Sequence, residues 1–467
     1  MEPNKNPTRT CHVVAMPFPG RGHINPMMNF CKLLASKTDE ILITFVVTEE
    51  WLGFIGSEPK PANIRFATIP NVIPSEKSRA ADYSGFISAV WTKMEEPFER
   101  LLERLEPQKK PSVIVYDTYL LWAVDVGNRR NIPLASFWTQ QMSVFTVFYH
   151  FDLLKQNGHF PIDVSERGNE LVSYVPGIPP SRIADLPAVL SGKVPEVHTA
   201  YEALSRVPKA QYLLLTSIYE LESQTIDAIK AAISTPVYPI GPSIPYFGLG
   251  DNSSVSSDSQ QCETSYMRWL DSQPESSVLY ISMGSFLSIP RTQMDEIIAG
   301  VDMSGVRFFW VARDDASRIV EGCSDLSNKG VVVPWCNQLK VLCHSSIGGF
   351  WSHCGWNSVK EGVFAGIPFL TYPIFGDQMP NSKTVVDDWK IGWKVRRGMG
   401  DEEHLVTREE IANIVRRFMD LGSDEGKEMR RKAQELEEIC HRAVFEGGSA
   451  DAAINSFIQD ISSCHDC

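Results

Sequence analysis

The chain has 467 residues, of which 43% are hydrophobic and 22% are charged, and these proportions are ordinary for a globular protein. Its length exceeds what one ordinary core can organise, so we expect two domains of about 200 residues each. The formal net charge of −13 argues against a binder of nucleic acid or of anionic membranes, because both ligands attract basic surface.

The remaining bulk features indicate a cytoplasmic protein. No run of 18 apolar residues is present to span a membrane, and the polar N-terminus does not read as a signal peptide. The ten cysteines are scattered through the chain, which suits free thiols in a reducing compartment. We therefore expect a cytoplasmic monomer.

The first half of the chain alternates short apolar runs with helical stretches. Continuous apolar runs of this length are typical of parallel strands that are buried on both faces. The predicted strands lie at 12–16, 41–47, 113–116 and 212–215, and the clearest helices lie at 25–37 and 95–105.

A turn with two prolines, two glycines and His23 follows the first predicted strand, in the sequence PFPGRGHINPM at 17–27. Such a turn can cradle a phosphate, hold a catalytic base or merely reverse the chain. Local sequence does not decide between these three interpretations. Asp117 ends another predicted strand, so it is expected at the same sheet edge as His23.

The second half of the chain begins after a segment rich in Pro, Gly and Ser, and the strand–helix pattern then restarts. We predict an N-terminal domain at 1–240, a linker with a flexible loop at 241–262, a C-terminal domain at 263–445 and a tail at 446–467 that returns to the first domain. The fold class is α/β, with two facing Rossmann-like, doubly wound parallel-sheet domains and an interdomain cleft.

The most informative stretch runs from Trp335 to Gln378. A predicted strand leads into His353-Cys-Gly-Trp-Asn-Ser358, where a helix begins. The N-terminus of a helix that follows a parallel strand offers free N–H groups and a positive dipole end to an anion. Asn357 and Ser358 are residue types that favour the N-cap, so an ordinary capped helix explains this part equally well.

Other positions in this stretch favour a nucleotide sugar. Trp335 ends a strand, where its indole can stack on a flat base. Glu361 lies one turn after Asn357 on the same helix face and can accept ribose hydroxyls. Asp377 and Gln378 follow the next strand, where ligands of α/β folds bind, and adjacent Asp and Gln suit a sugar.

This 44-residue segment closely resembles the signature box of plant secondary-product glycosyltransferases, the UDP-sugar-dependent family with the GT-B fold. It has the W-x-x-Q start, the HCGWNS core, the following Glu, a Gly-x-Pro and the DQ end. The resemblance extends to His23, Asp117, the Phe-Trp-Thr at 137–139, and Ser285. It departs at Asn337, where the family usually has Pro, and at Lys360, which we expect on the outer side of the helix.

The resemblance implies a role for each matching residue. Trp335 and the Cys336 backbone should bind uracil, Gln338 and Glu361 the ribose, and Trp356, Asp377 and Gln378 the sugar. The diphosphate should contact residues at the start of the helix that follows His353 and one serine earlier in the chain. Thr139 should reach the sugar or its phosphate. The diphosphate residues are Ser285, His353, Gly355, Asn357 and Ser358.

The family's catalytic residues match His23, as general base, and Asp117, as its partner. The expected function is an inverting transfer of glucose from UDP-glucose to a hydroxyl of a small apolar acceptor such as a flavonoid, phenolic or terpenoid. UDP-glucose is a co-substrate, and no further cofactor is expected. No D-x-D motif is present, so no metal site is expected either.

Two alternative functions fit these residues less well. A catalytically weak sugar-nucleotide-binding relative would be expected to lack His23 or Asp117, and both are present. An NAD-type dehydrogenase would need G-x-G-x-x-G after the first strand, but Asn25 stands where the third Gly belongs. The acceptor pocket is expected around aromatic and aliphatic residues of the N-terminal domain, namely Phe86, Trp91, Trp138, Phe145, Phe148 and Leu186.

Overall fold

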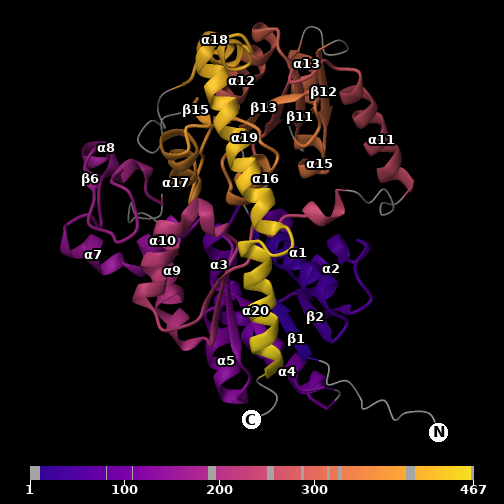
Figure 1. Ribbon diagram of the computed structural model, residues 1–467, viewed down its shortest axis with the longest axis vertical. Helices are drawn as coiled ribbons and strands as arrows, with labels where there is room; N and C mark the ends of the chain where they lie inside the picture. Colours follow the sequence, from indigo (N-terminus) through magenta and orange to yellow (C-terminus); the bar gives the residue numbers. More distant parts are fainter. Residues whose placement is uncertain are drawn as a thin grey trace. The chain divides into compact units, whose positions relative to one another are not determined.

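The computed structural model describes residues 11–79, 81–107, 109–187, 196–249, 257–284, 289–312, 316–323, 329–395 and 405–463. The chain divides into two compact units, shown in Figure 1. The first comprises 1–151, 195–247 and 443–467, and the second comprises 152–194 and 248–442. No helix among the described residues is both long and apolar enough to cross a membrane.

The first unit is built on a parallel sheet of seven strands in the order β3-β2-β1-β4-β5-β8-β9. These strands are β1 (Cys11–Met16), β2 (Ile41–Thr48), β3 (Ile64–Ile69), β4 (Val113–Asp117), β5 (Leu134–Trp138), β8 (Tyr212–Leu215) and β9 (Val237–Pro239). The helices are α1 (Arg21–Lys37), α2 (Glu49–Ile55), α3 (Tyr83–Lys93), α4 (Glu95–Leu105), α5 (Trp122–Arg130), α6 (Met142–Tyr149), α9 (Glu196–Arg206), α10 (Tyr219–Ala232) and α20 (Ser449–Ser463).

Both faces of this sheet are buried. Val13 and Ala15 of β1 pack into one hydrophobic cluster, and Val14 and Met16 pack into another on the opposite face, as alternation along a strand requires. The C-terminal helix α20 contributes Phe457 and neighbouring apolar residues to the first of these clusters. The continuous apolar runs therefore form strands covered on both sides, as predicted.

Helix α1 begins earlier than predicted, at Arg21 instead of residue 25. Gly22 and Pro26 suggested an irregular turn, but the amides of His23 and Ile24 both donate to the Gly20 carbonyl and close the first turn. Pro26 is accommodated inside the helix. His23 thus lies on the first turn of a helix, which holds it more firmly than a loop would.

The second unit contains a parallel six-stranded sheet in the order β12-β11-β10-β13-β14-β15. Its strands are β10 (Val278–Ser282), β11 (Arg307–Val311), β12 (Gly330–Val333), β13 (Ile347–Ser352), β14 (Phe369–Thr371) and β15 (Gly392–Lys394). Its helices include α11 (Ser257–Asp271), α12 (Arg291–Ser304), α13 (Ala316–Gly322), α15 (Gln338–Leu342), α16 (Trp356–Phe364), α17 (Gln378–Lys383), α18 (Arg408–Phe418) and α19 (Asp424–Val444).

The segment 152–194 packs with the second unit, although its neighbours in sequence belong to the first. It carries α8 (Val164–Arg167) and the short antiparallel pair β6 (Leu171–Val172) and β7 (Ser181–Arg182), and α7 (Phe151–Gln156) leads into it. Its buried Asp185 forms ion pairs with Arg182 at 2.8 Å and with Lys394 of β15 at 3.5 Å. Nothing in the sequence of this segment indicated that attachment.

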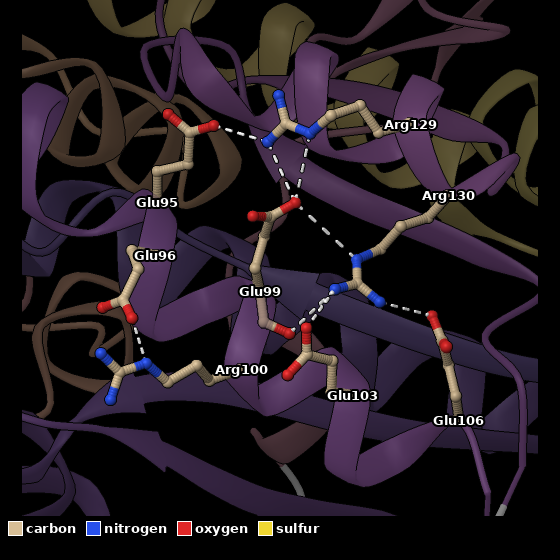
Figure 2. A network of polar contacts seen from close by, with 8 residues as sticks. All are labelled: Glu95, Glu96, Glu99, Arg100, Glu103, Glu106, Arg129 and Arg130. Carbon is tan, nitrogen blue, oxygen red and sulfur yellow. Dashed lines mark hydrogen bonds and ion pairs between the residues drawn. The ribbon is translucent and has the colours of Figure 1, made fainter.

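Helices α4 and α5 are joined on the surface by a network of ion pairs, shown in Figure 2. Arg130 contacts Glu106 at 2.9 Å and Glu103 at 3.1 Å, while Arg129 contacts Glu95 at 2.6 Å and Glu99 at 3.0 Å. Both arginines lie in the last turn of α5, where positive charge also interacts favourably with the helix dipole.

Candidate functional site

In the first sheet the strand order reverses between β1 and β4. Such a switch point opens a crevice at the carboxyl ends of the strands, where α/β folds bind their ligands. His23 follows β1, Asp117 ends β4 and Thr139 directly follows β5. Three residues that are far apart in sequence are therefore brought to one edge of the sheet.

These three side chains are in direct contact. His23 Nδ1 lies 2.7 Å from Asp117 Oδ2 and 3.1 Å from Thr139 Oγ1. Asp117 is 1% exposed, whereas the His23 side chain is 22% exposed. The second carboxylate oxygen of Asp117 accepts the amide of Tyr119 at 3.0 Å, so the carboxylate is fixed at both oxygens.

The hydrogen-bond pattern assigns the tautomer of His23. An ionised carboxylate can only accept, so Nδ1 must carry the proton that it donates to Asp117. In the neutral ring Nε2 then holds the lone pair. The arrangement can therefore take a proton at Nε2 and stabilise the resulting imidazolium through Asp117, which is what general-base catalysis needs.

Aromatic rings surround His23 within the first unit. The Phe18 ring centroid is 5.2 Å from that of His23, and the Tyr119 ring is 6.1 Å away. The predicted acceptor residues Phe86, Trp138, Phe145 and Phe148 are buried, and Trp91 donates its indole N–H to the Tyr119 carbonyl at 3.0 Å. Leu186 is buried in the second unit. Contact of these side chains with an acceptor stays a prediction.

In the second sheet the strand order reverses between β10 and β13. Helix α16 follows β13 and begins at Trp356, with Gly355 at the N-cap and no side chain capping it in the described structure. The residue types of Asn357 and Ser358 favour the N-cap position, but both residues lie in the first turn of α16 and neither is its cap. The uncapped N–H groups and the helix dipole offer a site for an anion.

His353 lies against the backbone at this switch point. A Cβ atom added to Gly284 or Gly355 would come within 2.7 Å or 2.6 Å of His353 Nε2, so a side chain at either position would force the imidazole to move. Burial lowers the pKa of His353 to about 4, although a backbone hydrogen bond with Ser282 opposes the shift. His353 is thus neutral near pH 7, carries a single N–H and brings no positive charge to this turn.

Gln338, at the start of α15, connects strand β10 with helix α16. Its Oε1 accepts from Tyr280 Oη at 3.0 Å, and its Nε2 donates to Glu361 Oε2 at 2.5 Å and to Ser358 Oγ at 3.1 Å. Burial raises the pKa of Glu361 to about 7, while the hydrogen bond from Gln338 opposes the shift. The amide of Gln338 is committed to these protein groups, and Glu361 is held as an acceptor.

Trp335 is 53% exposed and Cys336 is buried, although the two are adjacent in the loop after β12. An exposed indole on a short, fixed loop presents a flat face to a ligand. The neighbouring Asn337 caps α15 by accepting the Lys340 amide at 3.3 Å, and its own amide donates to Tyr266 Oη at 3.3 Å. These contacts hold the loop where the family's usual proline is absent.

Asp377 and Gln378 lie at the start of α17, after β14. Gln378 Oε1 accepts the amides of Ile374 and Phe375 at 2.7 and 3.0 Å, so its amide nitrogen is the group that can bind a ligand. Asp377 Oδ2 accepts from Asn381 Nδ2 at 2.9 Å. Trp356 is 5% exposed, with its ring centroid 6.3 Å from that of Trp389.

Sequence reasoning missed Tyr280 and Asn381, which bind predicted site residues from a strand and a helix outside the quoted motifs. It misplaced Lys360, which is 7% exposed and not on the outer side of α16. Ser285 lies outside the described residues. Among the described residues, no group of three or more His, Cys, Asp or Glu side chains could hold a metal ion.

Comparison with known proteins identifies the family and agrees with the fold. Residues 236–418 match the family described as UDP-glucoronosyl and UDP-glucosyl transferase. The chain belongs to the UDP-glycosyltransferases, and it is an enzyme of the plant type. It is 50% identical to UDP-glycosyltransferase 87A2 of Arabidopsis thaliana over 99% of both chains, and 51% identical to 87A1 of the same plant over 96% of this chain and 99% of that one.

Among solved structures, the chain is similar to Medicago truncatula UGT71G1 complexed with UDP-glucose. The TM-score is 0.81 at 27% identity, and the match covers 97% of this chain and 99% of that one. The two parallel-sheet α/β domains predicted from the sequence are therefore confirmed as a GT-B fold.

Proposed function

We propose that this enzyme transfers glucose from UDP-glucose to a hydroxyl group of a small apolar acceptor, with inversion at the anomeric carbon. His23 is the general base and Asp117 orients and stabilises it. The observation that carries the proposal is the 2.7 Å contact between His23 Nδ1 and the buried carboxylate of Asp117 at the switch point of the first sheet.

The chemistry requires a base of this kind. The acceptor oxygen attacks the anomeric carbon while it loses its proton, and an imidazole titrates in the range needed to accept that proton near neutral pH. The carbon–oxygen bond to the diphosphate breaks as the new glycosidic bond forms on the opposite face of the sugar. UDP leaves with the electron pair of the broken bond.

The donor is assigned to the second unit. Trp335 stacks on uracil, Glu361 accepts the ribose hydroxyls, and the N-terminus of α16 stabilises the charge that develops on the diphosphate. His353 lines the same turn as a neutral imidazole, and Asp377 with the amide nitrogen of Gln378 binds the sugar. The binding of UDP-glucose by a relative of the same fold supports this assignment.

The acceptor is assigned to the first unit beside His23. Phe18 and Tyr119 flank the imidazole, so the surface around the base is aromatic. We therefore expect a flat or fused-ring alcohol or phenol, such as a flavonoid, a simple phenolic or a terpenoid.

The test is a pair of single variants and their double variant, assayed with UDP-glucose and a panel of aglycones. We expect His23→Ala to lower turnover by roughly 10²–10⁴-fold, the usual contribution of a general base, while UDP affinity is retained. Asp117→Ala should lose as much or less, and the double variant should be little worse than His23→Ala because the pair acts as a unit.

A comparison of acceptors separates proton abstraction from a structural role. A phenol of low pKa is already partly ionised, so it should suffer less from His23→Ala than an aliphatic alcohol does. Equal losses for both acceptors would refute the general-base role. Wild-type protein that binds UDP-glucose and transfers nothing to any acceptor would favour a sugar-nucleotide-binding relative without activity.

A further inference from the structure

Asn381 joins the two parts of the proposed donor site. It lies on α17, its side chain is fully buried, and its Nδ2 donates to the Cys354 carbonyl and to Asp377 Oδ2, both at 2.9 Å. Both partners only accept, so the amide orientation of Asn381 is fixed by chemistry. Its two N–H hydrogens are thereby fully used.

The bond to the Cys354 carbonyl controls a peptide plane at the anion site. Cys354 has φ 65°, a left-handed conformation that is unfavourable for a residue with a side chain. Its amide donates to Ser352 Oγ at 3.0 Å, so the residue is held on both sides. In a trans peptide the carbonyl and the following N–H point in opposite directions, and Asn381 therefore turns the Gly355 N–H away from itself.

The bond to Asp377 fixes the rotamer of a carboxylate that is proposed to bind sugar hydroxyls. A side chain at position 381 must donate twice within a buried space to do both tasks. Aspartate has the same size but would place a second carboxylate against Asp377 and against a carbonyl. Alanine would leave both acceptors without their donor, which is costly for buried groups.

We propose that Asn381 is a positioning residue that ties the sugar-binding carboxylate of Asp377 to the diphosphate-binding turn at Cys354–Gly355. It acts on the reaction only through these two groups. The proposal rests on the function proposed above, because it presumes that the second unit binds UDP-glucose.

The test compares Asn381→Ala and Asn381→Asp with Ser382→Ala. Ser382 is the next residue of α17, is equally buried, and hydrogen-bonds Thr371 Oγ1 at 2.9 Å, away from the predicted site residues. Titration calorimetry gives Kd for UDP-glucose and UDP, steady-state assays give KM and kcat for donor and acceptor, and thermal unfolding monitors folding.

We expect Asn381→Ala to raise Kd for UDP-glucose about tenfold, to raise Kd for UDP less, and to narrow the preference for UDP-glucose over UDP-galactose. The KM for the acceptor should not change. Asn381→Asp should be worse than Asn381→Ala, although it preserves volume. If Asn381→Ala fails to fold, Asn381→Ser, whose hydroxyl keeps one donor in the buried space, still tests the loss of the paired hydrogen bonds.

Two outcomes would overturn the proposal. One is that the Asn381 variants match Ser382→Ala in donor affinity and sugar preference. The other is that UDP and UDP-glucose lose affinity equally, which would exclude a link to Asp377. If wild-type protein bound no UDP-glucose, the proposed function itself would fail, and this result is distinct from both.

Discussion

Glu361 offers a direct test of how the site balances stability against binding. Burial raises the pKa of its carboxyl from 4.5 to about 7, so folding is opposed by its ionisation. The contribution of Glu361 to stability is fully present below pH 4.5 and is lost as pH rises through 7. A shift of this size corresponds to roughly 3 kcal/mol.

Glu361→Gln removes the charge and keeps the shape. We expect the variant to be more stable than wild type at pH 8, by about 1–3 kcal/mol in the free energy of unfolding, and the difference to vanish near pH 4.5. UDP-glucose affinity should fall about 10–100-fold at pH 8, because a hydrogen bond to a charged acceptor is worth about 1.5–3 kcal/mol. In wild type, affinity should rise with pH through 7, since the diphosphate diester does not titrate there.

Urea unfolding at pH 5 and pH 8 and titration calorimetry with UDP-glucose across this range provide the measurements. Glu409→Gln, which alters an exposed glutamate in the first turn of α18, is the control. If Glu361→Gln were no more stable than wild type at pH 8, or if donor affinity were independent of pH in wild type, the reasoning would be refuted.

Four further predictions concern stability, the departures from the family pattern, and metals. Burial lowers the pKa of His12 to about 4, below its value in the unfolded chain, so the free energy of unfolding should fall as pH drops from 6.5 towards 4. The urea midpoint of His12→Gln should change less than that of wild type over this range, and an equal change in both proteins would contradict the prediction. Arg130→Ala should lower the free energy of unfolding by about 1–2 kcal/mol at low salt, whereas Arg129→Ala should lower it by less than 1 kcal/mol because the Arg129 side chain is 50% exposed. Equal losses in the two variants would show that exposure does not decide the strength of the ion pairs in Figure 2. Asn337 caps α15 through its side chain, and its amide donates to Tyr266. Asn337→Ala should therefore weaken UDP affinity about three- to tenfold through loss of the cap, and Asn337→Pro should bind UDP no more tightly than Asn337→Ala, because proline also removes the amide donor although φ −73° permits its ring. Tighter UDP binding by the Pro variant in calorimetry would count against this account. Glucose transfer should persist in excess EDTA, because the α16 N-terminus can stabilise the leaving diphosphate. A loss of turnover that Mg²⁺ or Mn²⁺ restores would contradict this role of the helix.

The fold was predictable because its strands are buried on both faces and therefore read as continuous apolar runs. The carboxyl ends of those strands predicted where His23, Asp117 and the donor residues would lie, since parallel strands end at one edge. Boundaries were less predictable. The glycines and proline around His23 suggested a turn, yet backbone hydrogen bonds to Gly20 extend α1 to Arg21.

Long-range side-chain contacts were not predictable from the sequence. Thr139 reaches His23 only because β5 lies beside β4, and Asn381 reaches Cys354 only because α17 packs near the end of β13. Lys360 shows the same limit, because helix periodicity alone does not tell which faces of α16 are covered. Such contacts depend on packing, which a local pattern does not encode.

Several unfavourable features meet at the carboxyl end of the second sheet. Cys354 adopts a left-handed conformation, burial raises the pKa of the Glu361 carboxyl group, and the Trp335 indole is exposed. Each of these features opposes folding or leaves apolar surface exposed to water, so stability alone does not explain them. In the function proposed above, a nucleotide sugar would compensate for each feature: the indole would gain a base, the carboxylate would gain hydroxyl donors, and the strained turn would present N–H groups to a diphosphate. Because a ligand that binds only the folded state stabilises it, the donor itself would offset the cost of keeping its site in this form.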